Sequence, residues 1–233
     1  MAHASALTGD HSHSAHDDTH GHPPTSTGLD NKKIAIWAFI GSECMLFASL
    51  ISTYLIYKGR SVVGPYPHDA CLPPGCSTPL PAILNIPVTS ASTFVLLMSS
   101  LAMVLALAAV EMKDQPAPTT FGQKLLRSSK LWLWMTAILG ATFLGFQAFE
   151  FTSFVHEGLT IRTNLFGSSF FTLTGFHGAH VTAGVLWLLT LLAIDYRRGL
   201  GPKDAINVDL AALYWHFVDV VWIVIFTLVY LIK

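Results

Sequence analysis

Long apolar runs separated by short polar segments dominate the chain from residue 34 to its end. Five of these runs reach the roughly 20 residues that cross about 30 Å of hydrocarbon. Lipid offers backbone amides no hydrogen-bond partner, and five spans cannot close a barrel, so each run is predicted to be a helix. The pattern predicts an all-α integral membrane bundle with spans at 34–57, 87–110, 131–155, 169–194 and 212–232.

Composition agrees with this pattern. The chain is 52% hydrophobic and only 12% charged, which leaves too little polar surface for a soluble domain. Residues 31–233 are therefore predicted to form one membrane domain. A cytoplasmic N-terminus would place nine of the thirteen Lys and Arg residues on the cytoplasmic side, which predicts the N-terminus inside and the C-terminus outside.

The first 30 residues differ from the rest. They hold six of the eleven histidines among Ser, Asp, Thr, Gly and Pro, without an apolar run. This composition predicts a disordered, His-rich polar tail. Loose binding of a transition metal is the alternative, although no fold would fix its geometry.

Two cysteines lie in the loop at 58–86, which the charge count places outside. Cys71 and Cys76 flank a Leu-Pro-Pro-Gly turn, which favours a disulfide in an oxidising compartment. Two free thiols, or a metal site that includes His68, are the alternatives.

Ionisable side chains lie inside or beside the predicted spans, where each costs about 2.5–3.5 kcal/mol even on lenient scales. They are Glu43, Glu150, His177, His180, His216 and Asp219. His177 and His180 are three residues apart and so share a helical face. Three interpretations stand for the histidines: hydrogen bonds between helices or to lipid headgroups, metal or haem ligation, and proton handling. Against haem, His180 is predicted about 16 Å from the outer surface and His216 only about 6 Å from the inner one.

The acidic residues carry different expectations. Glu43 lies near the middle of the first span, where a neutral carboxyl would hydrogen-bond across helices and an ionised one could take part in proton movement. His216 and Asp219 are three residues apart and are predicted to form a structural pair. Glu150, close to the end of its span, is expected to reach the membrane interface.

Small residues and tryptophans predict how the helices pack. Ala141 with Gly145, and Ala179 with Ala183, are spaced by four residues, as close helix packing in lipid requires. Trp215 is predicted to lie near an interfacial turn.

Four strings in four different spans carry a family resemblance. They are IGSECMLFASL at 40–50, GFQAFEF at 145–151, SSFFTLTGFHGAHVTAG at 168–184 and YWHFVDVVWIVIF at 214–226. Together they resemble subunit III of haem-copper terminal oxidases of the cytochrome c oxidase type. The familiar subunit has seven helices, and this chain is similar to the last five, as in short bacterial forms.

The resemblance implies a non-catalytic role in aerobic respiration at a bacterial inner membrane. Haem and copper would lie in subunits I and II, while this chain would carry no redox cofactor, metal or catalytic residue. It would pack on subunit I, bind phospholipid, and support proton uptake and stability during turnover. The implied partners are subunits I and II, membrane lipid and a respiratory supercomplex, with no nucleic acid.

Individual residues follow from the matching strings. Glu43 matches a buried family glutamate, and His177, His180, His216 and Asp219 match two signature helices. Arg197 and Arg198 lie near a lipid-phosphate arginine of the family, so the implied lipid-binding set is Arg197, Arg198, His177 and His180. The expected complex is an aa3-type cytochrome c oxidase, with a quinol oxidase as the alternative, and no residue of this chain identifies the electron donor. A haem-binding membrane cytochrome and a proton-coupled transporter are the alternatives from other classes.

Overall fold

The computed structural model describes residues 30–58, 60, 65, 84–114 and 120–232, and every regular element in them is helical. In chain order these are α1 (Asn31–Tyr57), α2 (Ile86–Glu111), η1 (Met112–Asp114), α3 (Phe121–Leu126), α4 (Ser129–His156), α5 (Leu165–Arg197), η2 (Pro202–Asp204), α6 (Ala205–Phe226) and η3 (Thr227–Leu231), the last a π-helix.

Five of these helices are long and apolar enough to cross a membrane, which confirms the predicted all-α bundle with five spans. Each helix extends beyond its predicted span at one end or both. The largest difference is at α6, which begins at Ala205 rather than at residue 212. The predicted His-rich tail and the Cys71–Cys76 loop lie outside the described residues.

The helices begin where the sequence supplies capping groups. The Asp30 carboxylate accepts a hydrogen bond from the Lys32 amide at 2.8 Å, and the Asn164 side chain accepts one from the Gly167 amide at 2.6 Å. Pro87 lies in the first turn of α2, where its missing N–H costs nothing. Such caps satisfy backbone donors that a helix start leaves open.

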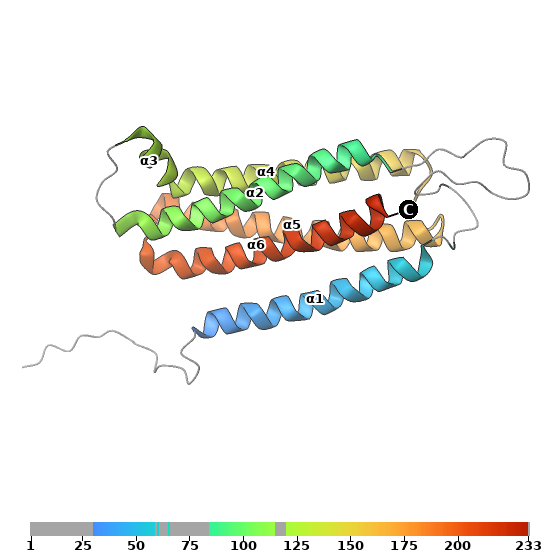
Figure 1. Cartoon of the computed structure of the whole chain (residues 1–233), viewed down its shortest axis with the longest axis horizontal. Helices are drawn as coiled ribbons and strands as arrows, with labels where there is room; N and C mark the ends of the chain where they lie inside the picture. Colours follow the sequence, from blue (N-terminus) through green and yellow to red (C-terminus); the bar gives the residue numbers. More distant parts are fainter. Residues whose placement is uncertain (1–29, 59, 61–64, 66–83, 115–119, 233) are drawn as a thin grey trace, which may run out of the picture.

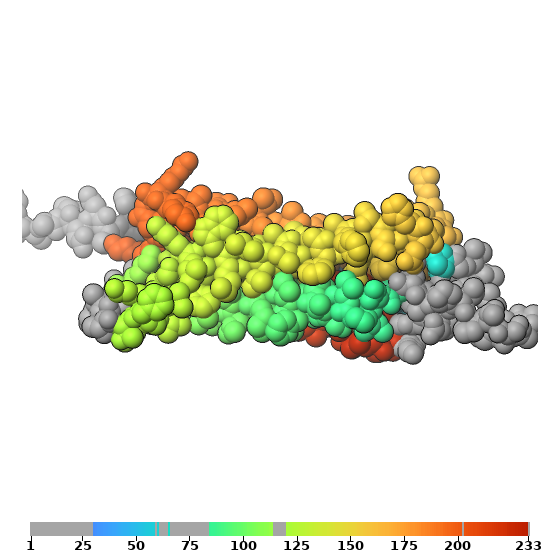
Figure 2. Space-filling model, turned by 90° about the horizontal axis from the view of Figure 1, so that it is seen from above, coloured from blue at the N-terminus to red at the C-terminus, as the bar shows by residue number. Residues whose placement is uncertain are grey.

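The helices run side by side, with α2 and α4 on one side of the bundle and α1 on the other (Figure 1). Figure 2 shows α2 and α4 packed along the face opposite α1. The first span is the least buried of the five, and it contributes only Phe47 and Tyr54 to the core. It contacts α5 and α6.

Polar contacts hold α1 at both ends. Near its start, Lys33 Nζ lies 2.6 Å from Asp209 Oδ2 of α6. At the other end, Lys58 Nζ donates to the carbonyl oxygens of Leu228 at 3.3 Å and Ile232 at 2.5 Å. Partial burial there lowers the pKa of the Lys58 ammonium. The first span is therefore joined to the last by charged groups as well as by packing.

The centre of the core is the Trp215 indole, which is 1% exposed. It lies between two glycines: a Cβ at Gly140 of α4 would be 2.6 Å from Trp215 Cη2, and one at Gly184 of α5 would be 2.8 Å from Cε3. The indole Nε1 donates to Ser99 Oγ of α2 at 2.9 Å. One side chain of α6 thus fixes three other helices, and it lies well inside α6, which begins at Ala205.

A buried carboxylate joins three helices at one end of the bundle. Asp195 of α5, 1% exposed, accepts hydrogen bonds from Ser129 Oγ at 2.7 Å and from the Leu200 amide at 2.8 Å. Lys113 Nζ, just beyond α2, lies 3.5 Å from the carboxylate and also donates to the Leu200 carbonyl. The ends of α2 and α5 and the start of α4 therefore share one ionic centre.

Candidate functional site

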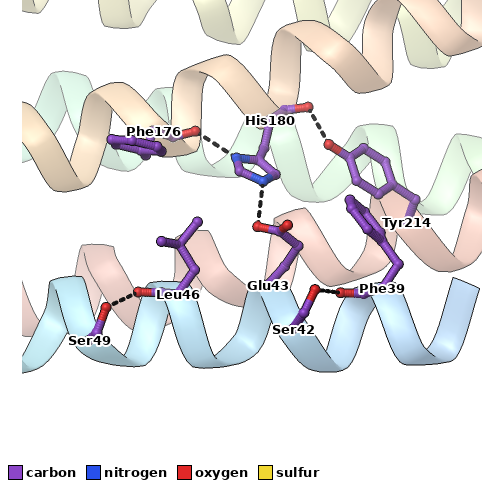
Figure 3. Close-up of polar contacts among 8 residues, drawn as sticks. All are labelled: Phe39, Ser42, Glu43, Leu46, Ser49, Phe176, His180 and Tyr214. Carbon is purple, nitrogen blue, oxygen red and sulfur yellow. Dashed lines mark hydrogen bonds and ion pairs between the residues drawn. The ribbon is translucent and has the colours of Figure 1, made fainter.

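The most developed polar site lies between α1 and α5. The Glu43 carboxyl points from α1 toward the His180 ring on α5, with Oε2 3.0 Å from Nε2 (Figure 3). The other ring nitrogen, Nδ1, lies 2.8 Å from the Phe176 carbonyl oxygen one turn earlier. Both side chains are mostly buried, with 17% of Glu43 and 15% of His180 exposed.

Hydrogen-bond counting assigns one proton to the contact between the two side chains. A carbonyl oxygen can only accept, so the proton on Nδ1 must point at Phe176, an assignment made from the bonding network. Nε2 then either accepts from a protonated Glu43 or, as an imidazolium, donates to its carboxylate. Both arrangements are neutral overall, and they differ only in which atom carries the proton. The site can therefore hold one proton and move it between Oε2 and Nε2.

Aromatic side chains enclose this pair. The Tyr214 hydroxyl of α6 donates to the His180 carbonyl oxygen at 3.1 Å (Figure 3). The Phe47 ring meets the His180 ring edge-on, with centroids 5.0 Å apart. The sequence strings pointed to Glu43 and His180 separately but not to their pairing, and Tyr214 was missed because an aromatic residue in an apolar run carries no separate signal.

His177 is in a different environment, although it shares the face of His180 as predicted. Its ring is fully buried, stacks on Trp222 at 4.8 Å and meets Phe143 edge-on at 5.8 Å. Neither ring nitrogen has a hydrogen-bond partner within the described residues. The lipid contact implied for His177 would need an exposed surface, and this side chain has none in the chain.

The predicted pairing of His216 with Asp219 is wrong. His216 Nδ1 lies 2.6 Å from Ser100 Oγ, because its ring turns toward α2. Neither Asp219 oxygen has a hydrogen-bond partner among the described residues. The sequence placed His216 close to the start of its span, but α6 begins at Ala205, so His216 lies well inside the helix. Ser100 lies in an apolar run, so the sequence did not indicate its contact with His216.

Glu150 was expected to reach the membrane interface, but its side chain is buried between α4 and α2. It is 6% exposed and is hydrogen-bonded to the Thr89 hydroxyl, because α4 turns this face toward α2.

The two arginines implied in lipid binding lie at the end of α5, near Asp195, with Arg197 as its last residue and Arg198 as its C-cap. Arg197 is exposed, while Arg198 Nη2 lies 3.0 Å from Asp204 Oδ1. Arg198 also lines a pocket of about 190 Å³ together with Trp187, Asn207 and Leu210. An arginine beside the apolar wall of a pocket is suited to bind a lipid phosphate. The lipid-binding role of Arg197 and Arg198 stays a prediction.

The described part of the chain brings no three His, Cys, Asp or Glu side chains together around a possible metal. His180 uses both ring nitrogens in hydrogen bonds, and His177 is enclosed by aromatic rings. These geometries favour hydrogen bonding and proton handling over haem ligation.

Comparison with known proteins gives a consistent result. The family model described as cytochrome c oxidase subunit III matches residues 12–233. The chain is 40% identical over 201 residues to cytochrome c oxidase subunit 3 of Bacillus sp. (strain PS3), covering 86% of each chain. It is 39% identical over 202 residues to the subunit of that name in Bacillus subtilis (strain 168), again 86% of each. Quinol oxidase subunit 3 of the same strain is 35% identical over 198 residues, or 85% of each.

Proposed function

The chain belongs to the cytochrome c oxidase subunit III family, and from this premise we propose that it is the non-redox subunit of a proton-pumping oxidase that reduces oxygen to water. As a member it is a multi-pass membrane subunit of a haem-copper terminal oxidase. The proposed role is to support proton uptake and to keep the complex stable during turnover.

The observation that carries this proposal is the Glu43–His180 pair. It joins two helices at 3.0 Å and holds a single proton that can lie on either side chain. In the described residues no metal-binding group accompanies it. A group of this kind can accept and release a proton but offers nothing to carry an electron. Proton handling is therefore the chemistry that this chain adds to the complex.

The remaining parts of the proposal concern its surroundings. Haem and copper belong to subunits I and II, and this chain packs on subunit I in a bacterial inner membrane. The excess of Lys and Arg favours a cytoplasmic N-terminus and an outside C-terminus. Phospholipid binds beside Arg197 and Arg198, and the complex joins a respiratory supercomplex.

We propose cytochrome c as the electron donor. The two cytochrome c oxidase relatives are 40% and 39% identical to the chain, against 35% for the quinol oxidase relative. The purified complex is expected to oxidise reduced cytochrome c and to leave a soluble quinol untouched. Oxygen uptake with quinol alone would assign the chain to a quinol oxidase instead.

Glu43→Gln in the assembled oxidase tests the role of the pair. The amide keeps the shape and one hydrogen bond to His180 but cannot exchange a proton. Haem content and the first turnovers should be unchanged, while proton uptake slows roughly tenfold, equivalent to about 1.4 kcal/mol. Stopped-flow recording of a pH dye during single turnovers measures this.

Ser42→Ala is the matched control. Its hydroxyl is next in sequence to Glu43, and in the described part of the chain it bonds within its own helix, to the Phe39 carbonyl at 2.7 Å (Figure 3). This variant should behave as the natural protein does. Loss of haem in Glu43→Gln, or proton uptake at the normal rate, would refute the proposed role.

A further inference from the structure

A second buried carboxyl lies apart from the Glu43–His180 pair, at the end of the bundle where α2 begins and α4 ends. Glu150 of α4 contacts the Thr89 hydroxyl of α2 and lies within hydrogen-bonding range of the Tyr230 hydroxyl on the π-helical segment after α6. Tyr230 is 1% exposed. Three helical segments thus bring their polar groups to one point.

The hydrogen bonds of Thr89 determine where the protons are. Its hydroxyl lies 3.0 Å from the Asn85 carbonyl oxygen, which can only accept, and it also contacts Glu150 Oε1. A threonine hydroxyl has one hydrogen and cannot donate to both oxygens. Both contacts become hydrogen bonds when Glu150 is protonated, because the acid donates to Thr89 and Thr89 donates to Asn85.

A pocket connects this carboxyl with the end of the bundle. Its volume is about 360 Å³, and Glu150, Asn85, Ser153 and Glu157 supply its polar lining. Glu157 follows α4 and is exposed, so the pocket extends from a buried acid to a solvated one. A proton leaving Glu150 therefore has a polar path outward, which the closely packed core around Trp215 does not offer.

The other groups described around Glu150 do not supply the hydrogen bond that its own proton would donate to Thr89. Tyr54 of α1, next to Tyr230, is fully buried, and its hydroxyl has no hydrogen-bond partner in the described part of the chain. From α5, the Phe170 ring packs against Tyr230 at 6.4 Å. The nearby cation, Lys58, is directed to the carbonyls of Leu228 and Ile232.

We propose that Glu150, Thr89 and Tyr230 form a proton-binding site that exchanges its proton through the Asn85–Glu157 pocket, independently of the Glu43–His180 pair. Glu150 binds the proton, Thr89 accepts the hydrogen bond of the acid, and Tyr230 orients the carboxyl. The chain then carries two separate proton sites, one between α1 and α5 and one between α2 and α4.

Infrared difference spectroscopy of the complete oxidase between neutral and alkaline pH tests the site. The natural complex should show the carbonyl band of a protonated carboxylic acid that shifts in D₂O. Glu150→Gln should remove this band completely, while Glu43→Gln leaves it in place. Thr89→Val should shift the band, because the acid loses its acceptor, and Thr89→Ser should restore its position.

Three results would overturn the proposal. The band could survive in Glu150→Gln, which would place the protonated acid elsewhere. It could fail to shift in D₂O over hours, which would deny exchange through the pocket. If Glu150→Gln does not assemble, the Thr89 variants provide the test. A band at the same position in Thr89→Val and Thr89→Ser would show that the protonated acid is not hydrogen-bonded to the Thr89 hydroxyl.

Discussion

Trp215→Ala is expected to destabilise the chain by about 3–5 kcal/mol, because it empties the space at which four helices meet. The indole contacts α4 and α5 at their glycines and donates to Ser99 of α2. Lipid cannot fill an enclosed space of this shape, so the packing contacts are lost outright. The temperature at which the purified complex releases this subunit measures the effect.

The two glycines provide the reciprocal test. Gly140→Ala and Gly184→Ala each add a methyl group closer than 3 Å to the indole, and each should cost about 1–3 kcal/mol. Gly145→Ala and Gly175→Ala are matched controls, since a Cβ there meets no atom within 4 Å. These two should be neutral, or stabilising by up to about 1 kcal/mol through helix propensity. Equal losses of stability at all four glycines would contradict the close packing of the Trp215 indole between Gly140 and Gly184.

The five spans could be predicted from the sequence because lipid permits few solutions. A run of about 20 apolar residues in hydrocarbon must be a helix, whatever packs beside it. The helix ends could not be predicted in the same way. Asn207 and Asp209 interrupt the apolar pattern before the last span, yet both lie within α6, since polar residues end a run of hydropathy without ending a helix.

The contacts between helices were less predictable than the helices. Ala141, Gly145, Ala179 and Ala183 have the spacing of close packing, but the positions that meet Trp215 are Gly140 and Gly184, one residue away. A shift of one residue turns a helical position by about 100°. Spacing along one helix does not fix which face meets a neighbour, because that depends on the rotation of every helix together.

The candidate site was also only partly predictable from the sequence. Glu43 and His180 stood out because ionisable groups in lipid are costly, and both lie in the site. Their pairing depends on how α1 lies against α5, which no single span reveals. Asp195 had no such signal, since an acid at the end of a span beside two arginines is typical of a solvated terminus. Its burial results from α2, α4 and α5 converging there.

Asp195 provides the second large expected effect. Asp195→Ala removes the acceptor of Ser129, of the Leu200 amide and of the Lys113 ammonium together. Removing one partner of a buried ion pair costs about 3–5 kcal/mol, and the loss here should lie at the lower end because 32% of the Lys113 side chain is exposed. Lys113→Met should cost slightly less, since two hydrogen bonds still hold the carboxylate. Release of the subunit on heating, or susceptibility of residues 120–128 to protease, would report the loss.

The ion pair of Arg198 and Asp204 is a control that distinguishes the effect of burial from the effect of the distance between the two charges. Its atoms are 3.0 Å apart, closer than the 3.5 Å between Lys113 and Asp195, but 63% of the Arg198 side chain is exposed. Arg198→Met should therefore cost only about 0–1 kcal/mol, since water already solvates the guanidinium, although only 19% of the Asp204 side chain is exposed. In the double variant Lys113→Met with Asp195→Ala, the total cost should be smaller than the sum of the two single costs, because no unpaired charge remains. Equal costs for Arg198→Met and Lys113→Met would mean that the ionic centre contributes no more than a surface pair.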